Sequence, residues 1–431
     1  MQYFSTNKLS PIVDFKTATV LGQAPDKGLF YPEKIPVWDE EFLDALKEIS
    51  RPYLSFKVMK PYVGGCIPDE KLFDIVEETI NFPFPLVSVQ EGMYALELFH
   101  GPTLAFKDVG ARFMSRCLGY FNAGNNKKVT VLVATSGDTG GAVANGFEGV
   151  EGVEVIILYP SGKVSPVQEL QLTTCGGNII ALEVNGTFDD CQAMVKQAFM
   201  DNDLKGRLQL TSANSINVAR WLPQQLYYCF ALQQWEHDTP PVISVPSGNF
   251  GNICAGMIAQ MSGLPVQHFI AATNVNDVIP AYLQTGDYNI KPSVATLSNA
   301  MDVANPSNFI RIMEMYDHKL SKLKTKLSSV SIDDDVTKET ISQVYNQTGY
   351  ILDPHGAVGY KALLEYLTAN PQQKGIFLET AHPVKFPDVV EEMIEKKLDI
   401  PVSVAPLFTR QKQSIMMDAT FDPFKEWLMN R

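Results

Sequence analysis

The sequence has few cysteines, and no spacing among them suggests a shared site. The six cysteines, at positions 66, 117, 175, 191, 229 and 254, include no Cys-x-x-Cys pair. This spacing predicts neither a zinc site nor a disulfide framework, so we expect no bound metal and reduced thiols that are mostly buried. The sequence also lacks any run of about 18 apolar residues, and its start, MQYFSTNKLS, is not a basic stretch followed by an apolar one. We therefore predict a cytoplasmic protein that does not bind membranes.

The sequence also has fewer basic than acidic residues. The 431 residues include 35 Lys and Arg against 48 Asp and Glu, which gives a formal net charge of -13. No segment combines basic and aromatic residues in the way that nucleic-acid-binding surfaces do. We therefore expect a small molecule as the partner, and neither nucleic acid nor an anionic membrane. Any anionic ligand must be held by local donors, because the overall field of the protein repels it.

Short apolar runs rich in β-branched residues alternate with helical patterns from Val129 onward. This alternation is typical of βαβ units that form a mostly parallel sheet covered on both faces. The predicted strands are 129–135, 153–160, 178–184, 241–246, 267–273 and 375–380. The sequence therefore predicts the α/β class.

The first 90 residues differ from the rest because they are punctuated by proline and rich in aromatic residues. A chain of this length is expected to form about three domains. Together with this contrast, that expectation predicts an N-terminal domain at 1–90 and two α/β lobes. The smaller lobe is predicted at 129–210, and the larger one is built from 91–128 and 211–431. We expect the charge-dense stretch 319–338 to be a surface helix and loop rather than a site.

Two strand-to-helix turns stand out because parallel strands present ligands at their carboxyl ends. One turn, 135–140, comes at the end of the predicted strand 129–135, and the other, 247–252, follows the strand 241–246. Glycines allow the backbone N–H groups to approach a ligand, hydroxyl groups add donors, and the helix N-terminus favours an anion. An ordinary capping turn has the same composition, so either turn alone leaves both interpretations open. Neither turn fits the Walker or the GxGxxG pattern, which argues against nucleotide hydrolysis and dinucleotide binding.

The triplet Asp138-Thr139-Gly140 also matches the sequence of an aspartic protease motif. That chemistry requires two carboxylates that share a proton, and no second DTG or DSG triplet is present. The parallel strand pattern around 129–184 also conflicts with the all-β framework of such enzymes. We therefore reject the protease interpretation.

Three further positions carry side chains suited to a site. Lys107 follows Ala105 and Phe106, and a lysine desolvated by such neighbours has a lowered pKa and can act as a Schiff-base nucleophile, although most lysines lie on the surface. Arg220 closes a donor-rich segment, 211–221, and its planar fork suits phosphate or carboxylate. Thr380 ends the last predicted strand and could present a hydroxyl group. Each of these residues also has an ordinary structural interpretation.

Together these passages resemble pyridoxal-phosphate enzymes of the tryptophan-synthase-β fold type, and within that group the threonine synthase family, particularly its bacterial and fungal members. The resemblance covers nearly the whole chain. Its most specific passages are 99–108, 134–144, 214–220, 245–252, 272–277, 298–308 and 380–388. It implies fold type II of these enzymes, with mostly parallel sheets in two lobes and a smaller N-terminal domain.

The resemblance also implies a role for each matching residue. Lys107 is implied as the catalytic residue that holds pyridoxal 5'-phosphate covalently, and Thr380 as the partner of the pyridine nitrogen. The cofactor phosphate is assigned to Gly248, Asn249, Phe250, Gly251 and Asn252. The substrate carboxylate is assigned to Ser136, Gly137, Asp138 and Thr139, with Asp138 also near the ring hydroxyl of the cofactor. The substrate phosphate is assigned to Ser215, Asn217 and Arg220.

The reaction that the resemblance implies is the conversion of O-phospho-L-homoserine and water to L-threonine and phosphate, by γ-elimination and addition of water at the β carbon. It requires receptors for three anions, and the sequence offers three donor-rich loops. A pyridoxal-phosphate-dependent dehydratase, a β-replacement enzyme and a non-catalytic homologue are the alternatives. The 214–220 segment argues against the first two, because only a phosphorylated substrate requires a second phosphate site, and Lys107 argues against the third. No oligomeric state is predicted.

One position departs from the pattern of the family. The residue before Thr380 is Glu379, where the family commonly has glycine. The surroundings of the pyridine nitrogen therefore differ from the family pattern at this position, and we expect the larger side chain to point away from the ring.

Overall fold

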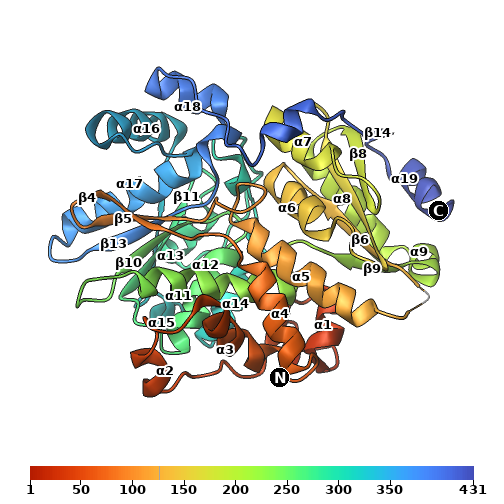
Figure 1. Cartoon of the computed structure of the whole chain (residues 1–431), viewed down its shortest axis with the longest axis horizontal. Coiled ribbons are helices and arrows are strands. Elements are labelled where there is room, and N and C mark those ends of the chain that lie inside the picture. The colour runs from red at the N-terminus through yellow and green to blue at the C-terminus, as the bar shows by residue number, and fades with distance from the viewer. Residues whose placement is uncertain (126) are drawn as a thin grey trace. The chain divides into compact units, whose positions relative to one another are not determined.

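The computed structural model of the chain describes residues 1–125 and 127–431, which form two compact units (Figure 1). The first unit contains Met1, Tyr31–Phe106 and Trp221–Asp399. The second unit contains Gln2–Phe30, Lys107–Arg220 and Ile400–Arg431. These units are divided differently from the three domains predicted from the sequence, whose limits stay a prediction.

The first unit is built on a six-stranded sheet in the order β12-β11-β10-β13-β5-β4. The neighbouring strands are parallel, except that β4 is antiparallel to β5. All five residues of β10 and of β13 are buried, as expected for central strands covered on both faces. The strands are β4 (Leu86–Gln90), β5 (Met93–Glu97), β10 (Val242–Pro246), β11 (His268–Thr273), β12 (Leu327–Ser331) and β13 (Gly375–Glu379).

Helices cover both faces of this sheet. Figure 1 shows α17 on one side and α11 with α12 on the other. Gly359 of α17 allows that helix to approach Pro246 of β10, and Gly256 of α12 is covered by the ring of Tyr228 from α11. The helices are α2 (Glu40–Asp44), α3 (Arg51–Val63), α4 (Asp69–Thr79), α11 (Gln225–Gln233), α12 (Gly251–Met261), α13 (Val278–Thr285), α14 (Phe309–Met315), α15 (Leu320–Leu323), α16 (Asp334–Thr348), α17 (Pro354–Ala369) and α18 (Pro387–Ile394), with 3₁₀ turns η1 (Leu222–Gln224), η2 (Asn299–Met301) and η3 (Pro383–Lys385).

The second unit is built on a five-stranded parallel sheet in the order β14-β8-β7-β6-β9. The strands are β6 (Val129–Ala134), β7 (Val153–Pro160), β8 (Ile179–Asn185), β9 (Gln209–Ser212) and β14 (Ile415–Asp418). The last part of the chain therefore returns to this unit and adds an edge strand to it. A short antiparallel pair, β1 (Gln2–Ser5) and β2 (Val13–Asp14), also belongs here, and β3 (Phe30–Pro32) lies where the chain passes into the first unit.

The helices of the second unit pack against its sheet and against one another. Residues of β6, β7 and β8 form one apolar core with Met194 of α8 and with Phe424 and Leu428 of α19. Thr187 and Asp190 start α8 with a capping box, which fixes the turn that leaves β8. The helices are α1 (Phe15–Leu21), α5 (Lys107–Asn122), α6 (Asp138–Phe147), α7 (Pro166–Thr173), α8 (Phe188–Met200), α9 (Asn202–Arg207), α10 (Val218–Trp221) and α19 (Phe421–Met429), with the 3₁₀ turn η4 (Ala405–Thr409). Helix α10 spans the point where the chain passes into the first unit.

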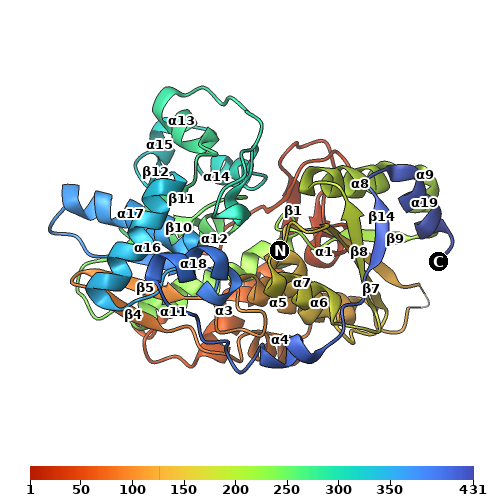
Figure 2. The same ribbon diagram turned by 90° about the horizontal axis from the view of Figure 1, so that it is seen from above.

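The predicted α/β class with mostly parallel sheets is confirmed. Each of the six predicted strands is present, with bounds within one residue of those predicted. The expectation of a surface helix and loop at 319–338 was wrong in part, because this stretch contains β12, which pairs with β11 at the edge of the sheet. Figure 2 shows β12 beside β11 in the second view.

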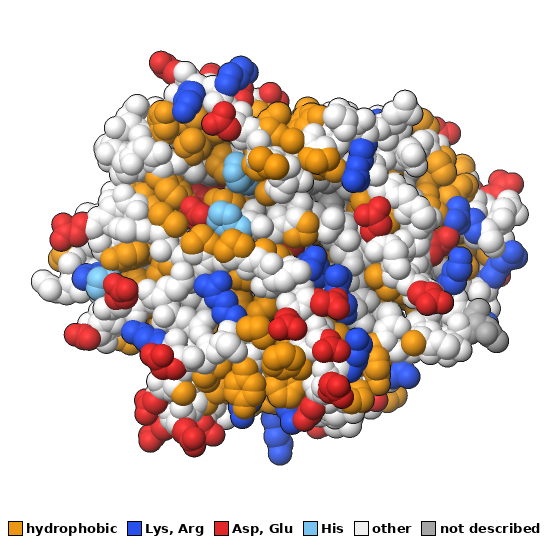
Figure 3. Space-filling model, viewed as in Figure 1, with side chains coloured by type: hydrophobic (Ala, Val, Ile, Leu, Met, Phe, Trp, Pro, Cys, Tyr) orange, Lys and Arg blue, Asp and Glu red, His pale blue; other side chains and the backbone are white. Residues whose placement is uncertain are grey.

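The surface and the cysteines agree with the composition. Acidic and basic side chains are interspersed over the face seen in Figure 3, rather than gathered by sign. The six cysteines are free thiols, and four of them are buried. Within residues 1–125 and 127–431, no helix is long and apolar enough to cross a membrane.

Candidate active site

Lys107 is held in an enclosed position in the second unit. It is the first residue of α5, and its Nζ lies 3.5 Å from Oδ2 of Asp138 at the start of α6. The two side chains are 16% and 4% exposed, so the interpretation of Lys107 as a surface lysine does not hold. The other carboxylate oxygen of Asp138 accepts a hydrogen bond of 3.0 Å from Nε2 of Gln168. Asp138 is therefore fixed in place beside the amine.

The loop after β6 has a shape that its own residues impose. Gly137 has φ 137° and caps α6, and a Cβ atom there would overlap with the side chain of Gln168, so only glycine fits. Oγ1 of Thr135 accepts the backbone N–H groups of Gly137 and Gly140 at 3.0 and 2.8 Å. Ser136 and Thr139 are half-buried at the start of the helix, where the first N–H groups have no partner within the helix. The loop is thus preformed and offers donors at a helix N-terminus.

Arg220 lies against the first turn of the helix that begins with Lys107. A Cβ atom at Gly110 would overlap with the backbone oxygen of Arg220 and would lie 3.2 Å from its Nε. Residues 107 and 110 are three positions apart, so they lie on the same face of α5. Arg220 is 3% exposed, and its Nη1 donates a hydrogen bond to the carbonyl of Ala213. The second unit therefore places a buried guanidinium one helical turn from the candidate nucleophile.

The side chain of Asn217 is engaged inside the segment that carries Arg220. Its Nδ2 donates to the carbonyls of Thr19 and Ser212 at 2.9 and 3.2 Å, and its Oδ1 accepts the N–H of Ala219 at 3.0 Å. These bonds use both amide hydrogens and tie the segment to α1 and β9. Ser215 lies in the same segment and is half-buried. The side chain of Asn217 therefore stabilises the conformation of the segment.

The loop after β10 in the first unit is held in an unusual conformation. Phe250 has φ 59°, which is left-handed and costly for a residue with a side chain, and it forms the N-cap of α12. Asn308 donates two hydrogen bonds, of 3.1 and 3.0 Å, to the carbonyl of Asn249. A Cβ atom at Gly248 would lie 2.5 Å from the carbonyl oxygen of Ala300. Contacts with the segment 300–308 therefore fix the conformation of the loop.

Thr380 follows β13 and is 5% exposed. Its carbonyl accepts a hydrogen bond of 2.9 Å from the N–H of Phe106, and the hydroxyl of Tyr227 donates to the carbonyl of Phe106. Both backbone groups of the residue that precedes Lys107 in the chain are thus fixed by the first unit. This places the end of β13 beside the residue that leads into α5.

Comparison with known proteins decides the family. The family described as "Pyridoxal-phosphate dependent enzyme" matches residues 81–378, and "Threonine synthase N terminus" and "Threonine synthase, C-terminal" match residues 2–80 and 356–427. The threonine synthase of Escherichia coli (strain K12) is 43% identical over 432 residues, which cover 100% of both chains. The chain belongs to the threonine synthase family.

Solved structures of threonine synthases agree with this family. A structure of PLP-bound threonine synthase from Brucella melitensis is 35% identical, with a TM-score of 0.94 that covers 100% of this chain and 99% of that one. The threonine synthase structure from yeast is 34% identical, with a TM-score of 0.90 over 99% and 98% of the two chains. As a member of the threonine synthase family, the protein is a pyridoxal-phosphate-dependent lyase of threonine biosynthesis.

The residues of this threonine synthase family member fit a phosphorylated cofactor. Asn252, in the first turn of α12, is 6% exposed, and its Nδ2 has no hydrogen-bond partner among the described residues, although Tyr228 donates to its Oδ1. A buried amide donor without a partner is costly, and an anion at the helix N-terminus would satisfy it. The close approach of Gly248 to Ala300 leaves no room for a side chain on that flank. These features suit the phosphate of pyridoxal phosphate.

Glu379 is the residue at which the sequence departs from the family pattern, and it is completely buried. Its two carboxyl oxygens have no donor in the described part of the chain. Burial, followed by the negative charge of Asp353, raises the pKa of Glu379 well above its usual range. In its protonated form the carboxyl group of Glu379 can donate one hydrogen bond to Asp353, which gives one of its two oxygens a partner. Its carboxyl group lies over Gly356, on the face of the sheet that α17 covers.

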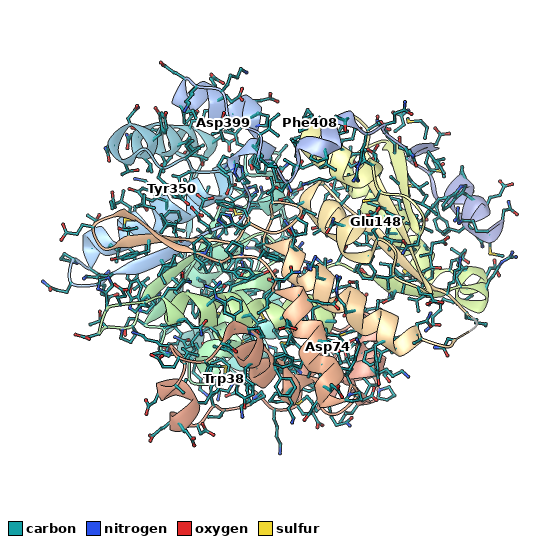
Figure 4. The ribbon with its side chains drawn as sticks, viewed as in Figure 1. Trp38, Asp74, Glu148, Tyr350, Asp399 and Phe408 are labelled. Atoms are coloured by element: carbon teal, nitrogen blue, oxygen red, sulfur yellow. The ribbon has the colours of Figure 1, made fainter. Side chains whose placement is uncertain are left out.

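The neighbours of Glu379 were missed by sequence reasoning. Asp353 is the N-cap of α17 and accepts the N–H groups of His355 and Gly356 at 2.9 and 3.3 Å. Burial acts to raise the pKa of Asp353. The neighbouring His355 and the hydrogen bonds that Asp353 accepts outweigh this effect and lower the pKa. Tyr350, labelled in Figure 4, donates to Oε1 of Glu97 at 2.9 Å near the same cluster. The Asp-Pro pair at 353–354 is a helix-start signal that could have drawn attention to this segment.

Proposed function

We propose that this member of the threonine synthase family converts O-phospho-L-homoserine and water to L-threonine and phosphate with the following assignment of residues. The observation that carries the assignment is the packing of Arg220 against Gly110, one turn of α5 away from Lys107. A reaction that expels phosphate needs a cationic receptor near the amine that moves the protons, whereas a dehydratase does not.

Lys107 is proposed as the catalytic residue that holds the cofactor. When bound, pyridoxal phosphate withdraws electrons from the α carbon of the substrate. The amine of Lys107 would take the α proton and a β proton in turn, and the γ-phosphate would leave. The two protons would return to the γ carbon and to the α carbon, while the hydroxyl of water adds at the β carbon and the remaining proton of that water passes to the released phosphate. Asp138, 3.5 Å from Nζ, keeps the amine in place and is also proposed to lie near the ring hydroxyl of the cofactor.

The loop after β10 is proposed to hold the cofactor phosphate. Its residues are Gly248, Asn249, Phe250, Gly251 and Asn252. The Nδ2 of Asn252, which has no hydrogen-bond partner among the described residues, and the N-terminus of α12 support this role, since both favour an anion. Thr380 is proposed to face the pyridine nitrogen with a neutral hydroxyl group. The carboxyl group of Glu379 lies over Gly356, so we assign it to the face of the sheet that α17 covers and give it no part in that contact.

Two parts of the second unit are proposed to hold the substrate. The loop of Ser136, Gly137, Asp138 and Thr139 would receive the carboxylate at the N-terminus of α6. Arg220 would receive the phosphate with Ser215, because a guanidinium can bind two phosphate oxygens at once. Asn217 contributes indirectly in this assignment, by holding the segment that carries Arg220.

The remaining predictions from the sequence stand as proposals beside this assignment. We propose a cytoplasmic location and a small-molecule partner, with neither nucleic acid nor a membrane bound. The net charge of -13 and the absence of a basic and aromatic cluster in the sequence support this proposal.

The test is to incubate the purified protein and pyridoxal phosphate with O-phospho-L-homoserine and to measure threonine and phosphate together. We expect the two products in equal amounts. Phosphate without threonine would contradict the assignment of the water-addition step. An assay of threonine and serine as substrates, with detection of the oxo acid, distinguishes a dehydratase, and no turnover of any of the three substrates would indicate a non-catalytic homologue.

A further inference from the structure

His355 links the buried carboxyl cluster of the first unit to the loop after β10. It lies in the first turn of α17 and is 2% exposed. Its Nδ1 is 2.6 Å from Oδ1 of Asp353, and its Nε2 is 3.2 Å from the backbone nitrogen of Ala300 in η2. The imidazole therefore bridges the helix to the segment that packs against Gly248.

The hydrogen-bond pattern assigns the proton of the imidazole. The backbone nitrogen of Ala300 can only donate, so Nε2 of His355 must accept and carries no proton. The ring proton then lies on Nδ1 and is donated to the carboxylate of Asp353. The acceptor at Nε2 is thus held in place by Asp353, which is itself fixed as the N-cap of α17.

The carbonyl of Ala300 carries this constraint to the loop. A Cβ atom at Gly248 would lie 2.5 Å from that oxygen and 2.9 Å from Cα of Met301, so the two backbones are in direct contact. The far end of the same segment is fixed by Asp302, which accepts Nδ2 of Asn274 at 2.9 Å. His355 is the contact that holds the near end, at the residue that touches Gly248.

We propose that His355 is a positioning residue for the loop that receives the cofactor phosphate. By accepting the N–H of Ala300, His355 holds the turn η2 in contact with Gly248. This contact fixes the backbone conformation of the loop before the phosphate binds. This inference rests on the proposed role of Gly248 and its neighbours in holding the phosphate.

Two variants of His355 distinguish the contacts that its two ring nitrogens make. In His355→Asn the amide can still donate to Asp353, but the side chain is too short to reach Ala300. In His355→Gln the amide oxygen can take the place of Nε2 and accept the N–H of Ala300. The pair therefore compares a variant without the contact to η2 with a matched one that retains it.

The measurement is the affinity of the full-length chain, freed of cofactor, for pyridoxal phosphate and for pyridoxal, which lacks the phosphate. We expect His355→Asn to lose about 3- to 10-fold in affinity for pyridoxal phosphate, the value of one hydrogen bond. Its affinity for pyridoxal should be unchanged, and His355→Gln should resemble the wild type with both ligands. An equal loss for both ligands, or no loss for either, would overturn the positioning role.

A second measurement needs no variant. Hydrogen exchange of the segment 298–302 in the wild type should be slower with pyridoxal phosphate bound than with pyridoxal bound, because the coupling between the loop and η2 is reciprocal. Equal exchange in the two states would overturn the inference.

The wild type also separates this inference from the assignment on which it rests. If the wild type binds pyridoxal as tightly as pyridoxal phosphate, the role of the loop in holding the phosphate is wrong, and the role of His355 falls with it. If the wild type prefers pyridoxal phosphate and His355→Asn keeps the full preference, only the role of His355 is wrong.

Discussion

The carboxyl group of Glu379 occupies the space that a side chain at Gly356 would need. A Cβ atom built at position 356 overlaps with both carboxyl oxygens of Glu379. Gly356 is the third residue of α17, and its φ does not lie in the left-handed region. The requirement for glycine therefore comes from the residue on β13 and not from the backbone conformation.

This relationship predicts that Gly356→Ala destabilises the protein only while Glu379 is present. In the wild-type background, we expect a loss of about 1 to 3 kcal/mol in the free energy of unfolding, the usual cost of overpacking a core. In the Glu379→Ala background the same substitution should be neutral or stabilising by up to about 1 kcal/mol, because alanine is the better helix former. Denaturant unfolding of the four proteins of the cycle measures the coupling.

The prediction has a matched control in the same helix. Gly359 of α17 is three residues further on, and a Cβ atom there would meet Pro246 and not Glu379. The cost of Gly359→Ala should therefore be the same in both backgrounds. A Gly356→Ala cost that does not depend on residue 379 would contradict the contact.

Replacement of Lys107 tests the covalent attachment of the cofactor. Lys107→Arg keeps a positive charge beside Asp138 but has no primary amine. We expect the visible absorption of the covalently bound cofactor and its trapping by borohydride to be lost, with pyridoxal phosphate still bound by its other contacts. The control is Lys361→Arg, a surface position paired with Glu365, which should leave both signals unchanged. An unchanged spectrum in Lys107→Arg would show that another residue holds the cofactor.

Replacement of Arg220 separates the two phosphate sites. We expect Arg220→Ala to lower kcat/KM for O-phospho-L-homoserine by about 100-fold, because a buried charged partner of the phosphate is removed. The affinity for pyridoxal phosphate should change far less. Cofactor titration and steady-state kinetics on the same preparations measure the two effects, with the exposed Arg207→Ala as control. Loss of cofactor with retained substrate affinity would mean that the two phosphate sites have been exchanged.

The strands that the sequence predicted are runs in which apolar residues, many of them β-branched, predominate. The predicted run 153–160 coincides with β7, in which seven of eight residues are buried. Strand β12, with the sequence LSSVS, lies at the edge of its sheet and has one buried residue. Its strand structure depends on its pairing with β11, and no apolar pattern marks it. The amino-acid composition of β12 therefore does not reveal that it is a strand.

The site residues divide in a similar way. Lys107 and Arg220 could be proposed from the sequence because a lysine after apolar residues and an arginine in a donor-rich segment have a chemical meaning by themselves. The bonds of Asn217 run to Thr19, almost 200 positions earlier, so its structural task could not be read locally. The pairing of Asp353 with Glu379, and of His355 with Ala300, likewise joins residues that are distant in the sequence and is visible only in the folded chain.

A buried carboxylate in the second unit makes the stability of the protein depend on pH. Glu183 of β8 accepts hydrogen bonds of 2.7 Å from Ser161 and 2.9 Å from Ser414, and lies 2.7 Å from Nζ of Lys412. Burial acts to raise the pKa of Glu183, but the hydrogen bonds from Lys412 and the hydroxyl groups outweigh it and lower the pKa to about 2. Ser414 and Lys412 belong to the last part of the chain, so this carboxylate anchors that segment.

Because the pKa of Glu183 is lower in the folded state than its ordinary value of 4.5, its contribution to stability is present above that value and is lost as the pH falls towards about 2. We expect Glu183→Gln to be less stable than the wild type by about 2 kcal/mol near about pH 6, and the difference to shrink as the pH falls to about 2. The control is Glu154→Gln, which removes a surface ion pair with Arg431 and should cost little at any pH. Denaturant unfolding across this range measures the difference, and parallel curves for the wild type and Glu183→Gln would show that the charge of Glu183 does not anchor the segment.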